Sequence, residues 1–187
     1  MDKQVKILGI AGSLRKGSYN RAALRAAQQL VPQNASIEIF ELDGIPPFSE
    51  DDERNPPERV SLFKSRIRVA DAILFVTPEY NYSFPGVLKN AIDWASRPYG
   101  DNAWDGKPVA VMGASIGTMG TSRAQYHLRQ TFVFLNMYPV IRPEVMIANA
   151  AKRFDVQGNL TDNDTKEHIR RLLVSLVEWT KKITNYE

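Results

Sequence analysis

Cysteine is absent from the 187 residues. Its absence excludes disulfides, thiol nucleophiles and clusters held by thiolates, so any redox chemistry requires a bound cofactor. Histidine is scarce: His127 and His168 both lie in stretches with helical patterning, and we interpret them as solvated or packed side chains and not as catalytic groups. We read the acidic cluster Glu50 to Glu53 as the solvated face of a proline-rich loop and not as a metal site.

Long apolar runs are also missing, since no segment approaches the roughly 20 apolar residues that span a bilayer. The apolar stretch near the start is too short for a signal sequence, so we expect a cytoplasmic protein. The 24 Lys and Arg against 21 Asp and Glu leave a net charge of +3 that is scattered along the chain. This balance helps to attract anionic ligands but does not mark a nucleic-acid surface. The length fits one domain over residues 1–187.

Short β-prone runs alternate with stripes of helical periodicity along the chain. The apolar runs predict strands at Val5–Ala11, around Ile37–Phe40, at Ala72–Val76, at Val109–Ala114 and within Val140–Ala148. The stripes predict helices around Ala22–Leu30, over Glu58–Ala70, from Phe84 (with Pro85 in the first turn) to before Pro98, over Thr121–Leu135 and after a capping box of Thr161 and Asp164. Five strands that alternate with five helices indicate an α/β fold with a doubly wound parallel sheet and helices on both faces.

The weakest strand candidates are the second and the fifth, and we place them at the sheet edges. Glu38 and Glu41 flank the second, while Pro139 and Pro143 confine the fifth to an edge. The resulting order is 2-1-3-4-5, which is flavodoxin-like, with its switch point between strands one and three. The loops that follow these two strands, GSLRKGSYN and PEYNYS, are therefore expected to face one another across one crevice.

The first loop, residues 12–20, follows a strand and opens a helix, so its N–H groups and the helix dipole favour an anion. Arg15 adds a planar charged fork suited to phosphate. The loop is not a nucleoside-triphosphate loop, because Ser18 and Tyr19 stand where GxxxxGK[ST] requires Lys and Ser or Thr. The spacing of GxGxxG is absent too, which leaves a monophosphate ligand. The alternative is a strand-to-helix turn that is rich in Gly and Ser for steric reasons.

The second loop suits a flat aromatic ligand. Tyr80 and Tyr82 can stack, Asn81 can donate and accept hydrogen bonds, and Pro78 stiffens the approach. The alternative is an ordinary turn whose tyrosines cover the core. A phosphate pocket opposite an aromatic loop is what a mononucleotide with a large planar ring needs, and FMN meets that description.

Three segments, GSLRKGSYN, PEYNYSFPGVLKNAIDWASRP and GASIGTMGTSRAQYHLRQ, resemble the flavin-site segments of the NADPH-dependent FMN reductase family, which includes soluble quinone and chromate reductases. The resemblance extends over nearly the whole chain and says least about the excursion 149–164. It implies non-covalent FMN, with the phosphate bound by Ser13, Arg15, Ser18 and Asn20 beside Leu14, and with the ring or ribityl side contacted by Pro78, Glu79, Tyr80, Asn81, Ser115 and Gly117.

The mechanism implied by the resemblance is a ping-pong hydride transfer from NAD(P)H through FMN to quinones or other small acceptors, with chromate, azo compounds and free flavin as further candidates. The cofactor carries this chemistry, so we expect no catalytic side chain and no metal. One alternative is a flavodoxin-type electron carrier with protein partners, but such carriers are typically strongly acidic and this chain is net positive. Another is a nucleotide-binding regulatory module, which would be colourless.

The stretch 121–135 carries a second face that its docking on the sheet does not require. Ala124, Leu128, Phe132 and Leu135 form the expected core stripe, while Arg123 and Tyr126 are placed to form a joint planar surface elsewhere on the helix. Because Tyr and Arg are enriched in interface cores, and because the family forms dimers or tetramers, we expect a homodimer or homotetramer. Glu144 is the candidate acidic partner of Arg123 in that contact.

Overall fold

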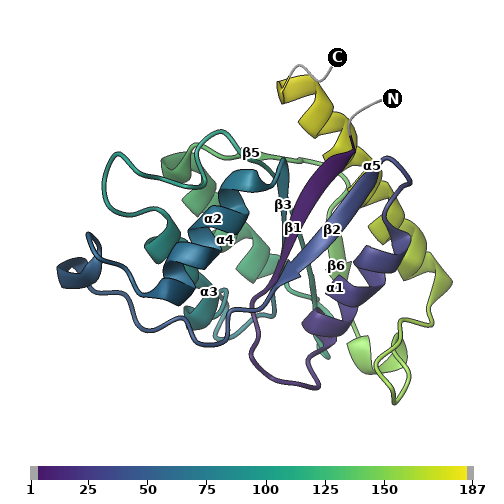
Figure 1. Ribbon diagram of the computed structural model, residues 1–187. Coiled ribbons are helices and arrows are strands. Elements are labelled where there is room, and N and C mark those ends of the chain that lie inside the picture. Colours follow the sequence, from purple (N-terminus) through teal and green to yellow (C-terminus); the bar gives the residue numbers. More distant parts are fainter. Residues whose placement is uncertain (1–3, 185–187) are drawn as a thin grey trace.

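The computed structural model describes residues 4–184, and its centre is a parallel sheet between two helical layers (Figure 1). The strand order is β2-β1-β3-β4-β5, with β6 paired to β4, which confirms the predicted flavodoxin-like order. The strands are β1 (Val5–Ala11), β2 (Ala35–Phe40), β3 (Ala72–Val76), β4 (Pro108–Ala114), β5 (Tyr138–Pro139) and β6 (Val145–Ile147).

Helices α1 (Tyr19–Leu30) and α5 (Asn163–Thr184) cover one face of the sheet (Figure 1). Helices α2 (Glu58–Val69), α3 (Gly86–Ala95) and α4 (Ser122–Leu135) cover the other. Two short 3₁₀ turns, Glu50–Asp52 and Ala150–Lys152, lie in the long connections. The side chains of Glu50, Asp51 and Asp52 are exposed, as expected for a solvated loop face.

The central strand β3 is buried along its whole length, which explains why it reads as a continuous apolar run. Successive side chains of a strand point to opposite faces. Leu74 and Val76 accordingly join the core beneath α1 and α5, whereas Ile73 and Phe75 join the core beneath α2, α3 and α4. The predicted docking stripe of α4 is likewise buried, and its residues Leu128, Phe132 and Leu135 belong to this second core.

The fifth strand differs from its prediction. Instead of one strand within 140–148, two short pieces pair with opposite ends of β4: Tyr138 with Pro108, and Val145 with Met112. Between the pieces the chain leaves the ladder, where Pro143 has no N–H to donate. An interrupted edge strand therefore takes the place of the continuous one.

Two helix starts also differ from their predictions. Pro85 is the N-cap of α3 and not a residue of its first turn, because the helix begins at Gly86. The cap of α5 is Asp162 and not Thr161: the Asp162 carboxylate accepts hydrogen bonds from the backbone N–H of Thr165 (2.9 Å) and from its hydroxyl. The Thr161 hydroxyl instead donates to the carbonyl of Arg153.

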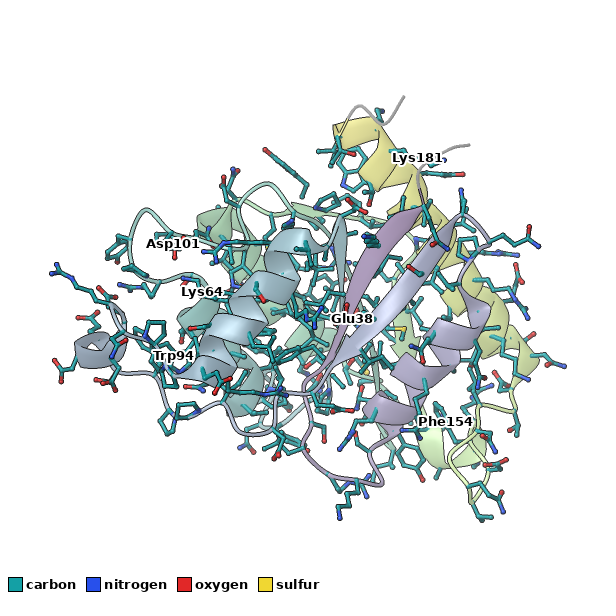
Figure 2. All side chains as sticks on the ribbon, in the orientation of Figure 1. Glu38, Lys64, Trp94, Asp101, Phe154 and Lys181 are labelled. Atoms are coloured by element: carbon teal, nitrogen blue, oxygen red, sulfur yellow. The ribbon has the colours of Figure 1, made fainter. Side chains whose placement is uncertain are left out.

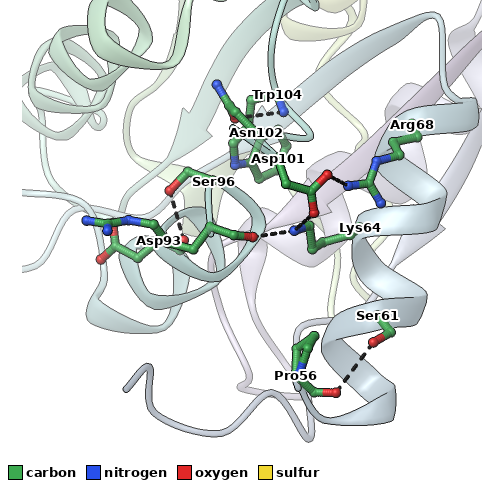
Figure 3. Close-up of polar contacts among 10 residues, drawn as sticks. Pro56, Ser61, Lys64, Arg68, Asp93, Ser96, Asp101, Asn102 and Trp104 are labelled. Atoms are coloured by element: carbon green, nitrogen blue, oxygen red, sulfur yellow. Dashed lines mark hydrogen bonds and ion pairs between the residues drawn. The ribbon is translucent and has the colours of Figure 1, made fainter. Parts of the chain in front are cut away.

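Helix α2 fixes the loop that leads into β4 (Figure 3). The Lys64 ammonium, almost fully buried, donates to the carbonyl of Arg97 and to the Asp101 carboxylate, at 2.6 Å from the latter. Arg68, one turn further along α2, donates to the other Asp101 oxygen. The Lys64 bond is the main cause of a pKa for Asp101 below its usual value, and Arg68 adds to the effect. These bonds hold the 97–101 loop against α2.

Candidate functional site

Three loops meet at the carboxyl edge of the sheet, and they follow β1, β3 and β4. In Figure 1 this edge is at the bottom, opposite the two chain ends. The Gly12 N–H donates to the Val76 carbonyl and the Thr77 N–H donates to the Met112 carbonyl, both at 2.9 Å. The loops after β1 and β3 therefore each start with a hydrogen bond to the neighbouring strand. A Cβ at Gly12 would lie 3.4 Å from the Pro78 ring, which shows how closely the first two loops approach.

The loops enclose a crevice of about 330 Å³, within the range of small-molecule sites. Its walls include eight residues that the sequence predicts: Ser13, Arg15, Ser18, Asn20, Pro78, Glu79, Tyr80 and Ser115. The other predicted residues, Leu14, Asn81 and Gly117, lie on the same loops outside these walls. The prediction omitted Tyr19, Ala114 and Ile116. Ile116 had a signal in the sequence, because it is a large apolar residue in a loop that is otherwise rich in Gly, Ser and Thr.

The β1 loop ends at the N-cap of α1. The Ser18 hydroxyl oxygen accepts from the Asn20 N–H at 3.2 Å, which leaves the hydroxyl hydrogen free to donate into the crevice. The first N–H groups of a helix have no partner within it, so the start of α1 offers donors to an anion. Ser13 resembles Ser18, since its hydroxyl accepts from the Arg15 N–H.

The Arg15 side chain is exposed, and its guanidinium lies near Gly17 of the same loop. A Cβ added at Gly17 would be 3.7 Å from Arg15 Nη1. Among residues 4–184 no carboxylate lies within ion-pairing distance of Arg15, in contrast to Arg21, which pairs with Glu41. An unpaired guanidinium beside a helix N-terminus is suited to bind a phosphate.

Asn20 is buried, and its side chain has protein partners. The amide Nδ2 donates to the Ala114 carbonyl at 2.9 Å, and Oδ1 accepts from the Ala114 N–H at 2.8 Å. This pair of bonds ties the start of α1 to the end of β4. One N–H of the amide stays available toward the crevice that Asn20 lines.

The β3 loop makes a tight two-residue turn. Tyr80 and Ser83 exchange two backbone hydrogen bonds of 2.9 Å, and between them Asn81 and Tyr82 have φ of 51° and 64°. Both φ values at the turn centre are positive, as in the type I′ turns of hairpins. The rings of Tyr80 and Tyr82 project from this turn and are more than half exposed.

Glu79 lies just before that turn, and its carboxylate faces α4. Oε2 accepts from the backbone N–H groups of Arg123 and Ala124, at 3.0 and 3.2 Å, while Oε1 accepts from the Arg123 guanidinium at 2.9 Å. Glu79 is thus the side-chain cap of α4, whose N-cap residue Thr121 makes no such bond. On α4, His127 Nδ1 lies 3.2 Å from the Ser83 hydroxyl and so also contacts the turn. His168 is an exposed residue of α5.

The β4 loop is hydrogen-bonded to the start of the 149–164 excursion. Ser115 Oγ accepts from the Gly117 N–H at 3.1 Å, and the N–H groups of Asn149 and Ala150 donate to the carbonyls of Gly117 and Ser115 at 3.0 Å. Further along is Phe154, which is labelled in Figure 2. Its ring packs against that of Tyr19, the first residue of α1, with 5.5 Å between the ring centroids. The excursion therefore contacts two of the three loops of the site.

The residues present suit a mononucleotide. At one end of the crevice are helix N–H groups, serine hydroxyls and the unpaired Arg15, and at the other is the turn with its exposed tyrosine rings. Over residues 4–184 there is no group of three or more His, Cys, Asp or Glu side chains that could hold a metal ion. In the same range, no helix is long and apolar enough to cross a membrane.

The fold is flavodoxin-like, and the crevice at its switch point has a lining that suits a mononucleotide. Comparison with known families is specific: the NADPH-dependent FMN reductase family matches residues 5–152. The chain belongs to this family. The resemblance that the three loop segments carry is thereby confirmed, and the match ends within the excursion where we expected least similarity.

Similar proteins cover nearly the whole chain. An NAD(P)H-dependent FMN reductase of Pseudomonas aeruginosa is 53% identical over 98% of this chain and 99% of its own length. A 2-hydroxy-1,4-benzoquinone reductase of a Burkholderia species is 40% identical over 95% and 97% of the two chains. Among solved structures, the flavoenzyme NAD(P)H:(acceptor) oxidoreductase FerB of Paracoccus denitrificans has a TM-score of 0.88 at 36% identity, over 95% of this chain and 98% of its own.

Proposed function

We propose that residues 1–187 form one FMN-binding domain that oxidises NAD(P)H and reduces quinones or other small oxidised acceptors. The observation that carries this proposal is the crevice itself, where an unpaired arginine at a helix N-terminus faces a tight aromatic turn across the switch point of the sheet. Family membership supports the same reading, and the similar proteins named above are reductases of this kind.

Bound FMN would supply the hydride chemistry. Of the protein's own residues, Arg15, Ser13, Ser18 and the first N–H groups of α1 would hold the phosphate, with Leu14 alongside and with Asn20 fixing the loop geometry. Pro78, Glu79, Tyr80 and Asn81 would form one wall of the ring site, and Ser115 and Gly117 the other. N–H groups aimed at the site favour negative charge there.

The mouth of the crevice is apolar and open. Tyr80 and Ile116, which line the crevice, are each more than half exposed, so a flat nicotinamide or quinone can pack against them. NAD(P)H and the acceptor would then use the same space in turn, and the kinetics should be ping-pong. No residue of the site is recognisably dedicated to the 2′-phosphate that distinguishes NADPH from NADH.

Two measurements test the function. The purified protein should show a flavin visible spectrum, and it should oxidise NADPH or NADH catalytically with a quinone, with parallel double-reciprocal lines at several fixed quinone concentrations. Chromate, azo dyes and free FMN can replace the quinone in the same assay. A coloured protein that does not turn over would be an electron carrier, and a colourless one would be a regulatory module. Intersecting lines would indicate a ternary complex.

We also infer a homodimer or homotetramer and a cytoplasmic location, where NAD(P)H is available. Helix α4 supports the assembly, because Tyr126 is half exposed and Val133 and Phe134 are 86% and 73% exposed. Such apolar exposure on one helix is typical of an interface. Arg123 and Glu144 remain candidates for the same contact, although within the subunit Arg123 lies against Tyr82 and not against Tyr126 as the sequence had indicated.

A further inference from the structure

Three residues from two parts of the chain form one connected group, which we name the turn clamp: Glu79, Arg123 and Tyr82. Glu79 accepts from Arg123 through both its backbone N–H and its guanidinium. The same guanidinium lies over the Tyr82 ring, with 4.1 Å between Cζ and the ring centroid. The clamp therefore begins immediately before the 80–83 turn and returns to that turn through the first residues of α4.

The turn that the clamp holds is conformationally costly. Asn81 tolerates a left-handed backbone, but Tyr82 has a Cβ that disfavours it, and the two occur in succession. Glycine is the residue usually found at the second such position. Some contact outside the turn has to offset this cost, and the only ring or ion contact of the Tyr82 side chain within residues 4–184 is with Arg123.

Arg123 can offset the cost because it is itself held in place. An exposed arginine loses side-chain entropy when it stacks on a ring, which limits the gain from the contact. Here Glu79 fixes the guanidinium, and the Glu79 side chain is only 10% exposed. The ion pair also neutralises a carboxylate that lines the crevice, where an uncompensated negative charge would oppose an anionic ligand.

We propose that Glu79 is a positioning residue: through Arg123 it holds Tyr82, and so it fixes the 80–83 turn in the conformation that walls the crevice before any ligand binds. The part of this inference that concerns ligand affinity rests on the proposed FMN site, whereas the part that concerns the turn does not. A preorganised wall lowers the ordering cost of binding.

Glu79→Gln separates the clamp from the helix cap. The glutamine oxygen can still accept from the N–H groups of Arg123 and Ala124, while its NH₂ group faces the guanidinium donor and the ion pair is lost. Arg123→Lys keeps the charge but loses the planar stacking group. Asp93→Asn is the matched control, because it breaks an exposed ion pair with Lys89 on α3, outside the crevice.

The first readout is hydrogen exchange of the apoprotein at the Tyr80 and Ser83 amides, which donate to each other's carbonyls. Glu79→Gln and Arg123→Lys should each lower the protection of these two amides about five- to tenfold, while the urea midpoint and the protection of β3 amides stay at wild-type values. FMN affinity, measured by fluorescence titration, should fall by a similar factor. Asp93→Asn should change none of these quantities.

Unchanged protection at Tyr80 and Ser83 in both clamp variants would overturn the proposal, whatever the flavin affinity. A loss of protection spread over the whole α4 helix would also overturn it, because Glu79 would then act only as a cap. If the wild-type protein binds no FMN, the proposed function fails, yet the exchange experiment on the apoprotein still decides the role of the clamp. Reduced protection with unchanged FMN affinity would refute preorganisation of the binding site.

Discussion

The Asn20 side chain and the Ala114 backbone exchange two hydrogen bonds, of 2.9 and 2.8 Å, across the interior of the protein. Asn20 is the second residue of α1, and Ala114 is the last residue of β4. Since β3 lies between β1 and β4, this bond pair spans the switch point and fixes the start of α1, at one side of the crevice, relative to the end of β4 at the other.

We predict that Asn20→Ala destabilises the apoprotein by about 2 to 4 kcal/mol, because it leaves a buried N–H and a buried carbonyl of Ala114 without partners. Asn20→Asp, of nearly the same shape, should also destabilise, since a carboxylate would face the Ala114 carbonyl. Urea denaturation without flavin measures both. Wild-type stability for both variants would mean that Asn20 acts only on the ligand.

We predict that Arg15→Ala weakens FMN binding roughly 10- to 100-fold, the loss expected for a hydrogen bond to a charged group. Folding stability should not change, because the side chain is exposed and makes no ion pair among the described residues. Lys16→Ala removes the same charge from the neighbouring exposed position and should have a much smaller effect. Equal affinities for wild type and Arg15→Ala in a flavin titration would remove Arg15 from the phosphate site.

We predict that Gly113→Ala is destabilising by about 1 to 3 kcal/mol or more, as expected for overpacking. A Cβ at this position would lie 2.1 Å from the Thr121 hydroxyl and 2.2 Å from the Thr77 carbonyl, so the β3 and β4 loops would have to move apart. Gly86→Ala is the control, with no atom within 4 Å of the added Cβ. It should be neutral or stabilising by about 0.5 kcal/mol. Denaturant midpoints of the two variants test this prediction, and a Gly113→Ala midpoint equal to that of wild type would contradict it.

We predict that acid removes the stabilising contribution of Asp101. Its pKa is lowered in the folded state, chiefly by the bond from Lys64, so the contribution is present above the unfolded pKa near 3.8 and is lost as the pH falls through the lower folded value. Because Asp101 is half exposed, we expect an effect of at most about 1 kcal/mol. In Asp101→Asn the contribution should be missing at pH 7, and its stability should converge with that of wild type as the pH falls below 3.8 and through the lower folded-state pKa. If the curves of stability against pH for wild type and Asp101→Asn stay parallel until the protein unfolds in acid, the prediction is wrong.

We predict that the FMN-loaded protein sediments as a dimer or larger species at micromolar concentration, and a single species near the 21.1 kDa chain mass would refute this. Val133→Asp, on the most exposed apolar residue of α4, should promote dissociation on dilution because it places a charge in the contact. Val156→Asp is the matched control on a valine of the excursion that is even more exposed than Val133 and does not belong to α4. Equal stability of both variants to dilution would place the contact on another face.

The sequence by itself determined the order of the sheet and the place of the site. Continuous apolar runs such as Ala72–Val76 are typical of parallel strands buried on both faces by helices, and parallel strands bring their following loops to one edge. The sequence also predicted an anion site, because a glycine- and serine-rich loop with an arginine at the start of a helix favours an anion whatever the rest of the fold.

Only the tertiary structure decided which partners these side chains have. Asn20 and Ala114 are 94 residues apart, and Glu79 and Arg123 are 44 apart, so no local pattern records that the first pair ties α1 to β4 or that the second caps α4. The sequence did not predict the split of the fifth strand for the same reason. Strand pairing depends on which backbone groups at the two ends of β4 have no other partner strand. Local propensity reaches a few residues along the chain, whereas a hydrogen-bond partner is chosen by distance in space.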